Sequence, residues 1–137
     1  MNTSYTYEPS VRLRDLDRNG HVNHPVYAAY LGETRAAYYR DVLEEDLSEL
    51  DTVIVHISID FVESIEYADS ITIDVAVTEI GTSSLTMEYE IRHDDGTMVA
   101  TAKTVQVRYG NGGAESEAIP DTWRHAILDY EDRDVSR

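Results

Sequence analysis

The chain has 137 residues, no cysteine, and 27 acidic against 11 basic residues, which gives a net charge of −16. This length suits one domain with a sizeable core, and the lack of cysteine excludes disulfide bonds and thiolate metal sites. So strong a negative charge disfavours nucleic-acid binding, because that needs clustered positive charge. We therefore expect a single domain over residues 1–137, with a peripheral tail from about residue 114.

Composition also indicates the cellular setting. Lys103 is the single lysine, the other ten basic residues are arginine, and the hydrophobic fraction of 42% is high enough for a folded core. Acidic, lysine-poor surfaces suit cytoplasms of high salt, where ions screen self-repulsion. No apolar run approaches the roughly 20 residues needed to span a membrane, and the first residues lack a signal-peptide pattern. We expect a cytoplasmic, halophilic protein without a membrane partner.

An alternating pattern predicts a first strand over residues 5–13, and a polar loop follows it. Pro25 is well placed as a first helical residue. From Val26 to about Leu43, large side chains recur at helical spacing, which predicts one long, well-buried helix. The expected stripe consists of Tyr27, Leu31, Thr34, Tyr38 and Val42.

Strand patterns with period two follow the helix. They cover residues 53–61, 71–77, 85–91 and 98–109. The last has apolar residues on both faces, as a central strand would, and Asp95-Gly96 predicts a hairpin before it. Five apolar side chains of the first pattern are expected to share one face: Val53, Val55, Ile57, Ile59 and Phe61.

The order of strand, loop, helix and four consecutive strands indicates an α+β fold. One helix cannot cover both faces of a five-stranded sheet. The other face must therefore stay polar, or a second subunit must cover it or extend the sheet. In the tail, a short apolar patch surrounds Trp123, and the acidic run over residues 131–134 is expected to be solvated.

The loop before the helix concentrates groups that can donate, accept or orient a proton. Within eleven residues it holds a carboxylate, two amides, two imidazoles, a glycine and a phenol. The unpaired N–H groups of a helix N-terminus attract developing negative charge. We therefore interpret this loop as an active site. Its candidate residues are Asp17, Asn19, Gly20, His21, Asn23, His24, Val26 and Tyr27.

These residues resemble the hotdog-fold acyl-CoA thioesterases, in the family that includes 4-hydroxybenzoyl-CoA thioesterase. The pattern is R-x-x-D-x-x-G-H-V-N-x-x-x-Y, followed at helical spacing by Tyr-Leu and Glu-x-Arg. It is carried by Arg14, Asp15, Asp17, Gly20, His21, Val22, Asn23, Tyr27, Tyr30, Leu31, Glu33 and Arg35. The resemblance implies a hotdog fold, with one long central helix wrapped by a five-stranded antiparallel sheet.

The resemblance also implies an acyl-CoA substrate and self-association as a homodimer or homotetramer. Active sites in this family lie at the dimer interface, near the N-terminal end of the helix. Coenzyme A enters as part of the substrate, and no separate cofactor is expected. The scattered His56, His93 and His125 have no suitably spaced partners, so no metal site is expected.

On this resemblance, Asp17 falls at the position of the family's catalytic aspartate. His24 matches a histidine of one bacterial branch, whereas Asn19 and His21 match the plant acyl-carrier-protein thioesterases. The plant type also uses an acidic or cysteine residue at the position that is Val55 here. The resemblance therefore leaves the partner of Asp17 open between the two histidines.

Thioester hydrolysis needs an activated water or a nucleophile, and donors that stabilise the oxyanion. Asp17 can act as a base toward water or attack the carbonyl itself, although it also fits a turn carboxylate. Free N–H groups of His24 or Val26 would stabilise the oxyanion, since Pro25 has none. Gly20 would let the backbone bend close to the substrate.

The other candidates have structural interpretations beside functional ones. Asn23 is expected to cap or brace the helix start rather than touch substrate. Tyr27 is expected to pack or to form a pocket wall. Glu33 is expected to form an ion pair with Arg35 or Arg40, and its functional alternative is to face the thioester as a second carboxylate.

Two other activities stay open on the same fold. Enoyl-CoA hydratases use Asp-x-Asn-Pro-x-His, with five positions between the first and last residue, whereas Asp17 and His21 are four apart here. A non-catalytic acyl-CoA-binding module would not need Asp17 beside the carbonyl. The spacing of Asp17 and His21 disfavours the hydratase, and the presence of Asp17 disfavours the binding module, so hydrolysis is favoured.

Overall fold

The computed structural model describes residues 5–110, 113 and 115–131. The first four residues, on which the signal-peptide expectation partly rests, lie outside these ranges. The strands are β1 (Tyr5–Tyr7), β2 (Thr52–Phe61), β3 (Ile71–Ile80), β4 (Ser84–His93), β5 (Met98–Gly110) and β6 (Glu115–Ser116). They form one antiparallel sheet in the order β1-β3-β4-β5-β2, with β6 paired to β5. The predicted five-stranded sheet is confirmed, and β6 adds a short sixth strand.

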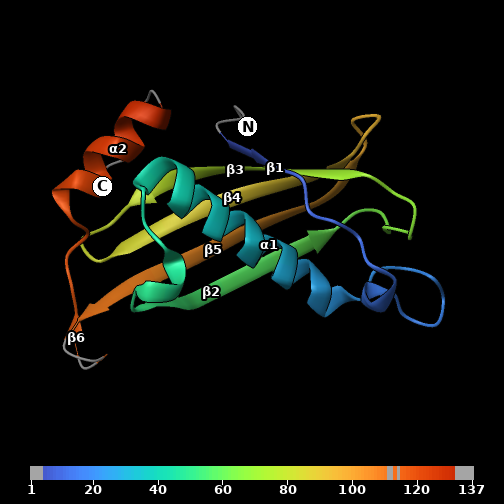
Figure 1. The fold of residues 1–137 in the computed structure, drawn as a ribbon, viewed down its shortest axis with the longest axis horizontal. Coiled ribbons are helices and arrows are strands. Elements are labelled where there is room, and N and C mark those ends of the chain that lie inside the picture. The colour runs from blue at the N-terminus through green and yellow to red at the C-terminus, as the bar shows by residue number, and fades with distance from the viewer. Residues whose placement is uncertain (1–4, 111–112, 114, 132–137) are drawn as a thin grey trace.

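The long helix α1 (His24–Tyr38) lies across one face of this sheet, which we call the inner face (Figure 1). It continues as a π-helix over Tyr39–Leu43 and ends at Glu44, whose φ of 55° is left-handed. The predicted extent of the helix is therefore confirmed, with a wider final turn. Four of the five predicted stripe residues are buried: Tyr27, Leu31, Thr34 and Tyr38. Burial of this stripe against the sheet stabilises the helix more than its intrinsic propensity does.

The first strand is shorter than predicted. β1 ends at Tyr7 instead of continuing to residue 13, and residues 13–15 form a 3₁₀ turn. Pro9 explains the early end, because proline has no N–H to donate to the neighbouring strand. The chain that leaves β1 is thereby free to run toward the N-terminus of α1.

The prediction that five apolar side chains of β2 share one face is wrong. The register between β2 and β5 shifts between Ile54 and His56, which marks a β-bulge. Directly paired residues share a face, so Val53 opposite Val107 lies on the other face from Ile57. A bulge inserts one unpaired residue and reverses the alternation, which a period-two pattern cannot reveal.

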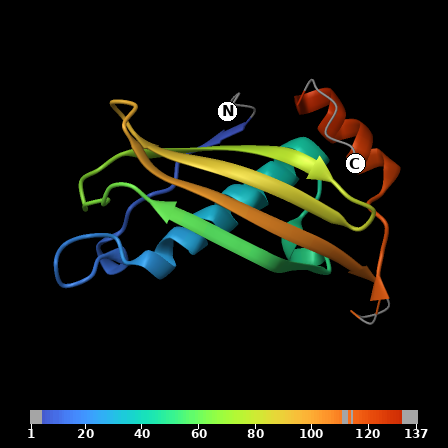
Figure 2. The ribbon, with the colours of Figure 1, turned by 180° about the vertical axis from the view of Figure 1, so that it is seen from behind.

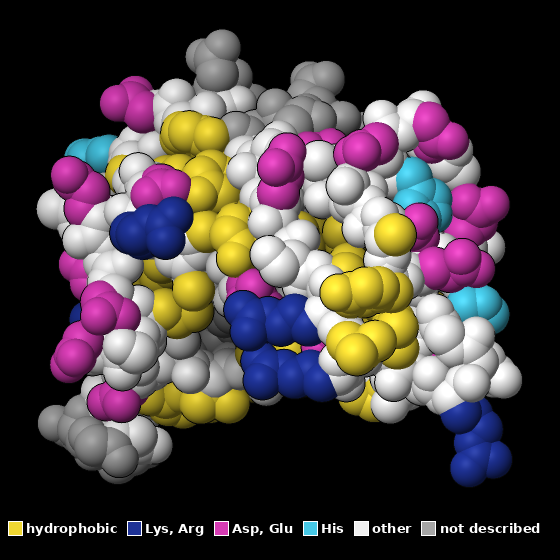
Figure 3. Space-filling view, turned by 45° about the vertical axis from the view of Figure 1, so that its right-hand side comes forward, with side chains coloured by type: hydrophobic (Ala, Val, Ile, Leu, Met, Phe, Trp, Pro, Cys, Tyr) yellow, Lys and Arg dark blue, Asp and Glu magenta, His cyan; other side chains and the backbone are white. Residues whose placement is uncertain are grey.

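The middle of β2 is not covered by α1. The helix crosses the sheet obliquely: His24 at its start stacks on Phe61 of β2, and Tyr38 at its end contacts Tyr5 of β1. As a result, Ile57 remains 45% exposed and Phe61 42% exposed. β2 is also an edge strand, paired on one side with β5. Figure 3 shows hydrophobic side chains reaching the surface between acidic ones on one side of the molecule.

The opposite face of the sheet, the outer face, is polar at its centre. Figure 2 shows it without a covering helix among the described elements. The strand register places Glu88 and Ser58 on either side of Lys103, and Glu90 and Asp60 also lie on this face. Of the alternatives predicted for this face, the structure therefore shows the one in which the face stays polar.

The tail contributes more to the core than predicted. The helix α2 (Asp121–Glu131) packs beside β3 and the end of α1 (Figure 1). Ile119, Trp123 and Ile127 join the hydrophobic core, although this segment was expected to be peripheral. Trp123 and Ile127 are four residues apart, so they lie on the same face of α2.

In the described residues, no helix is long and apolar enough to cross a membrane.

Glu131 corrects a second expectation for the tail. It begins an acidic run that was predicted to be solvated, yet its side chain is buried. Its Oε2 accepts hydrogen bonds from the Tyr38 hydroxyl at 2.8 Å and from the Val77 N–H at 2.9 Å. Residues 132–134 lie outside the described part of the chain. Buried donors are normally hydrogen-bonded, and Glu131 is the acceptor for these two. The sequence around Glu131 does not indicate that these donors lie beside it.

Replacement of Glu131 by alanine is expected to lower the free energy of unfolding by about 2 kcal/mol, because it leaves two buried donors without an acceptor. Urea unfolding followed by the fluorescence of Trp123 measures the effect. Glu131→Gln keeps an acceptor oxygen and is expected to cost less. The exposed Asp129→Ala serves as the control, with a change of roughly 0.5 kcal/mol or less. Equal effects of Glu131→Ala and Asp129→Ala would contradict the prediction.

Candidate active site

The loop that carries Asp17 closes on itself as a tight turn. Leu16 and Val22 form a β-bridge across its base. The Asp17 N–H donates to the His21 carbonyl at 2.8 Å, and the Gly20 N–H donates to the Asp17 carbonyl at 3.0 Å. Gly20 has a φ of +80°, which glycine adopts without steric cost. The glycine therefore serves the turn that presents Asp17.

One oxygen of the Asp17 carboxylate holds this turn. Its Oδ1 accepts hydrogen bonds from the N–H groups of Asn19 at 2.9 Å and His21 at 3.2 Å. The interpretation of Asp17 as a turn carboxylate is thus correct for one oxygen. Within the described part of the chain, Oδ2 accepts no hydrogen bond, and the side chain is exposed. The carboxylate keeps one oxygen available for a ligand.

Asp17 lines a cavity of about 210 Å³ at the N-terminal end of α1. The cavity is lined by Asp17, His21, Val22, His24, Tyr27, Phe61, Val62, Glu63 and Ser64. All three predicted catalytic candidates and Tyr27 therefore meet in one place. The last four residues were missed, because they lie at the end of β2 and directly after it, and only the folded sheet brings them beside the Asp17 loop.

Aromatic rings form one wall of this cavity. The His24 imidazole stacks on Phe61, with ring centres 4.1 Å apart and an angle of 20° between the planes. Tyr27 meets Phe61 edge to face at 4.9 Å. Burial raises the pKa of the Tyr27 hydroxyl, and a hydrogen bond with the Ile65 backbone opposes this rise. Tyr27 is therefore a buried aromatic member of this wall.

The His21 side chain contacts Glu66, in another segment of the chain. Its Nε2 lies 3.7 Å from Oε1 of Glu66, and the two residues also form a backbone β-bridge. In the described structure, neither the His21 nor the His24 imidazole hydrogen-bonds to Asp17. The partner of Asp17 thus stays open between the two histidines.

The helix start offers one free backbone donor. Asn23 occupies the N-cap position, but its side chain makes no capping hydrogen bond. The Val26 N–H donates to the Asn23 carbonyl at 2.9 Å, so the expectation that it is free for an oxyanion is wrong. Pro25 has no N–H. Among the described residues, the His24 N–H has no acceptor and remains the available donor.

Asp15 is a supporting residue that the sequence interpretation missed. Its Oδ2 accepts hydrogen bonds from the Tyr30 hydroxyl at 2.7 Å and the Arg12 N–H at 2.9 Å. Its carbonyl accepts the N–H of Asn23 at 2.9 Å. These bonds tie the loop to the second turn of α1. The available signal was that Asp15 and Tyr30 both belong to the family pattern.

Glu33 is not among the residues that line the cavity. Its Oε1 accepts a hydrogen bond from the Tyr7 hydroxyl at 3.1 Å, which links α1 to β1. The predicted ion pair with Arg35 or Arg40 is wrong, because Arg40 pairs with its neighbour Asp41 instead. Its role in binding substrate stays a prediction. Four other residues predicted to bind substrate also do not line the cavity, and their role stays a prediction: Asn19, Gly20, Asn23 and Val26.

Relatives of known class share this fold. Residues 11–127 match the model of the thioesterase-like superfamily. The chain is 29% identical to a thioesterase from Thermus thermophilus solved with coenzyme A and Zn; the match covers 98% of this chain and 99% of that one, with a TM-score of 0.87. It is 25% identical to a 1,4-dihydroxy-2-naphthoyl-CoA thioesterase from Synechocystis, over 93% and 97% of the chains, with a TM-score of 0.82. A curated relative, the uncharacterized protein YsmA of Bacillus subtilis, is 23% identical over 92% of this chain and 88% of its own length.

A single long helix wrapped by an antiparallel sheet is the hotdog fold, and the matched family and structures are thioesterases. The chain belongs to the thioesterase-like superfamily, because the family match spans most of its length. The predicted fold and enzyme class are thereby confirmed. Within the described residues, no group of three or more His, Cys, Asp or Glu is arranged to hold a metal ion.

Proposed function

We propose that Asp17 carries out acyl-CoA thioester hydrolysis in the cavity at the start of α1. The observation that carries the proposal is the shared cavity: Asp17 has an uncommitted Oδ2, and His24 has an unpaired N–H at the adjoining helix N-terminus. A carboxylate beside an oxyanion donor is what hydrolysis of a thioester requires.

As a general base, Asp17 takes a proton from water while the water oxygen bonds to the carbonyl carbon. The His24 N–H and the helix dipole stabilise the resulting oxyanion. The carbon–sulfur bond then breaks, the coenzyme A thiolate leaves, and Asp17 gives its proton to this thiolate. In the nucleophilic alternative, Oδ2 attacks the carbonyl carbon, the thiolate leaves, and water hydrolyses the mixed anhydride. In both routes His24 forms part of the cavity wall and His21 contacts Glu66, and which of the two assists Asp17 stays open.

A second copy of the chain completes the site in this proposal. The cavity of about 210 Å³ is smaller than the usual range of roughly 300–1,000 Å³ for ligand pockets. β2 supplies a ten-residue edge strand with exposed Ile57 and Phe61, which is a ready surface for pairing. The outer face, with Glu88 and Glu90, would repel another copy. Extension of the sheet through β2 into a homodimer, or a pair of dimers, is therefore favoured.

Arg18 is the proposed contact for the phosphates of coenzyme A. It is exposed beside Asp17, and no carboxylate pairs with it among the described residues. Arg92 and Arg108 already pair with acidic side chains. An arginine can bind phosphate through two parallel N–H bonds, and salt would screen the repulsion from this anionic protein.

Free thiol release from a panel of acyl-CoAs tests the proposal. The panel includes short and long aliphatic chains and aromatic acyl groups, because His24, Tyr27 and Phe61 form an aromatic wall. The assay runs in about 1 M KCl, where the Debye length is about 3 Å. We expect release from at least one acyl-CoA. Water addition to crotonyl-CoA without thiol release would favour the hydratase, and tight binding without turnover would favour the binding module.

A further inference from the structure

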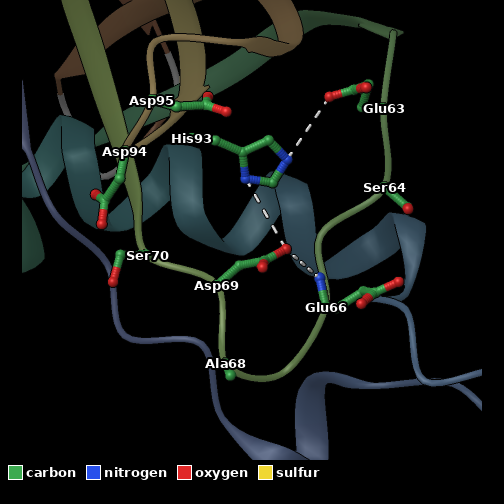
Figure 4. A pocket seen from close by; sticks show the side chains of 9 residues that line it. All are labelled: Glu63, Ser64, Glu66, Ala68, Asp69, Ser70, His93, Asp94 and Asp95. Carbon is green, nitrogen blue, oxygen red and sulfur yellow. Dashed lines mark hydrogen bonds and ion pairs between the residues drawn. The ribbon is translucent and has the colours of Figure 1, made fainter.

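A second cavity lies directly behind one wall of the candidate active site. It has a volume of about 760 Å³ and is drawn in Figure 4. Glu63 and Ser64 line both this cavity and the one that contains Asp17. The chain over residues 62–70 therefore separates the two, and its position sets one wall of the active site.

The segment over residues 62–70 also holds the Asp17 loop in place. The Val22 N–H donates to the carbonyl of Ile65 at 2.7 Å, and Ile65 is completely buried. His21 contacts Glu66 through both backbone and side chain. Any shift of this segment is thus transmitted to residues that follow Asp17 directly.

His93 reaches this segment from the end of β4. Its Nε2 lies 3.8 Å from Oε2 of Glu63, and its Nδ1 lies 3.9 Å from Oδ2 of Asp69. Figure 4 shows the imidazole between the two carboxylates, which come from opposite ends of the segment. The same Asp69 oxygen accepts the Glu66 N–H at 2.7 Å. A chain of contacts therefore runs from His93 through Asp69 and Glu66 to His21.

His93 lies among acidic side chains in this cavity. Three carboxylates of the segment over residues 62–70 line the same cavity as His93, and two more belong to its own hairpin. They are Glu63, Glu66, Asp69, Asp94 and Asp95. His93 is the one basic side chain among the residues that line this cavity. A protonated imidazole attracts both carboxylates beside it, whereas a neutral side chain leaves them to repel one another.

We propose that His93 is a positioning residue for the hydrolysis: it holds residues 62–70 against the Asp17 loop and so sets the wall of the active site. The inference rests on the proposed function. A wall displaced by about 1 Å misaligns a bound thioester, and misalignment of that size can lower turnover by roughly a hundredfold.

The kinetic test compares His93→Gln with the wild type and with His125→Gln, a control at an exposed histidine of α2. We expect kcat of His93→Gln to be about tenfold lower, with KM within about twofold, because alignment rather than affinity is lost. Both proteins keep Asp17 and His21, so the ratio of wild-type to variant kcat isolates position 93. A ratio of one, or a loss that lies in KM and not in kcat, would overturn the inference.

Amide hydrogen exchange provides a readout without substrate. In His93→Gln, the N–H groups of Val22 and Glu66 are expected to exchange about tenfold faster, while those of β3 and β4 are unchanged. Unchanged exchange at both amides overturns the role of His93, even if the wild type hydrolyses acyl-CoA. Absence of thiol release by the wild type, with faster exchange in the variant, counts against the proposed function instead.

Discussion

Replacement of Asp17 by asparagine is expected to lower kcat/KM about 10³-fold for any acyl-CoA that the wild type hydrolyses. Asparagine keeps an Oδ1 that accepts the N–H groups of Asn19 and His21, so the turn persists. Its amide can neither take a proton from water nor form a mixed anhydride. The loss is therefore expected in turnover and not in folding, and thiol release together with thermal unfolding measures both.

The matched control is Asp129→Asn, which removes the same charge from an exposed position of α2. It is expected to keep wild-type activity, which separates chemistry from the effect of net charge. Full activity of Asp17→Asn would remove Asp17 from the mechanism. A large drop in its unfolding temperature would show that the turn, rather than the chemistry, depends on the carboxylate.

Introduction of acidic side chains on β2 is the second prediction with a large expected effect. The wild type is expected to be a dimer or tetramer, and the double variant Val55→Asp and Ile57→Asp is expected to be monomeric. Thiol release should fall more than a hundredfold, because a monomer lacks the proposed second part of the site. Two carboxylates on each copy would repel across a paired edge, and both positions are exposed in one chain, so the monomer is expected to fold.

Size-exclusion chromatography with light scattering, together with the thiol assay, checks this prediction. Leu13→Asp is the control, because Leu13 is 70% exposed and lies outside β2. It adds a charge to an exposed apolar residue without touching the edge strand. A wild-type monomer with full activity would contradict the proposed assembly, and so would an active monomeric double variant.

Several features of the fold were predictable because they depend on neighbours in the sequence. The stripe of α1 and the alternation in β3 and β4 follow from the periods of helix and strand. The hairpin at Asp95-Gly96 requires a positive φ, and Gly96 has a φ of +88°. The Asp17 loop was recognisable because its polar groups lie within one short run before a helix.

Other features depend on partners that are distant in the chain. The bulge in β2 arises where its register against β5 shifts, so Val53 faces away from Ile57. The burial of Glu131 depends on donors from Tyr38 and Val77, each more than fifty residues earlier. No local pattern indicates that an acidic residue in a charged tail will satisfy buried donors.

The sequence by itself determined the order of the elements from β1 to β5, the buried side of the long helix and the turn that presents Asp17. Only the tertiary structure decided what faces that turn. Pairing of β2 with β5 brings Phe61, Glu63 and Ser64 beside Asp17, and the β4–β5 hairpin brings His93 behind them. Periodicity specifies which side of an element is buried, whereas the residues that meet across a cavity depend on strand register and on the segments between strands.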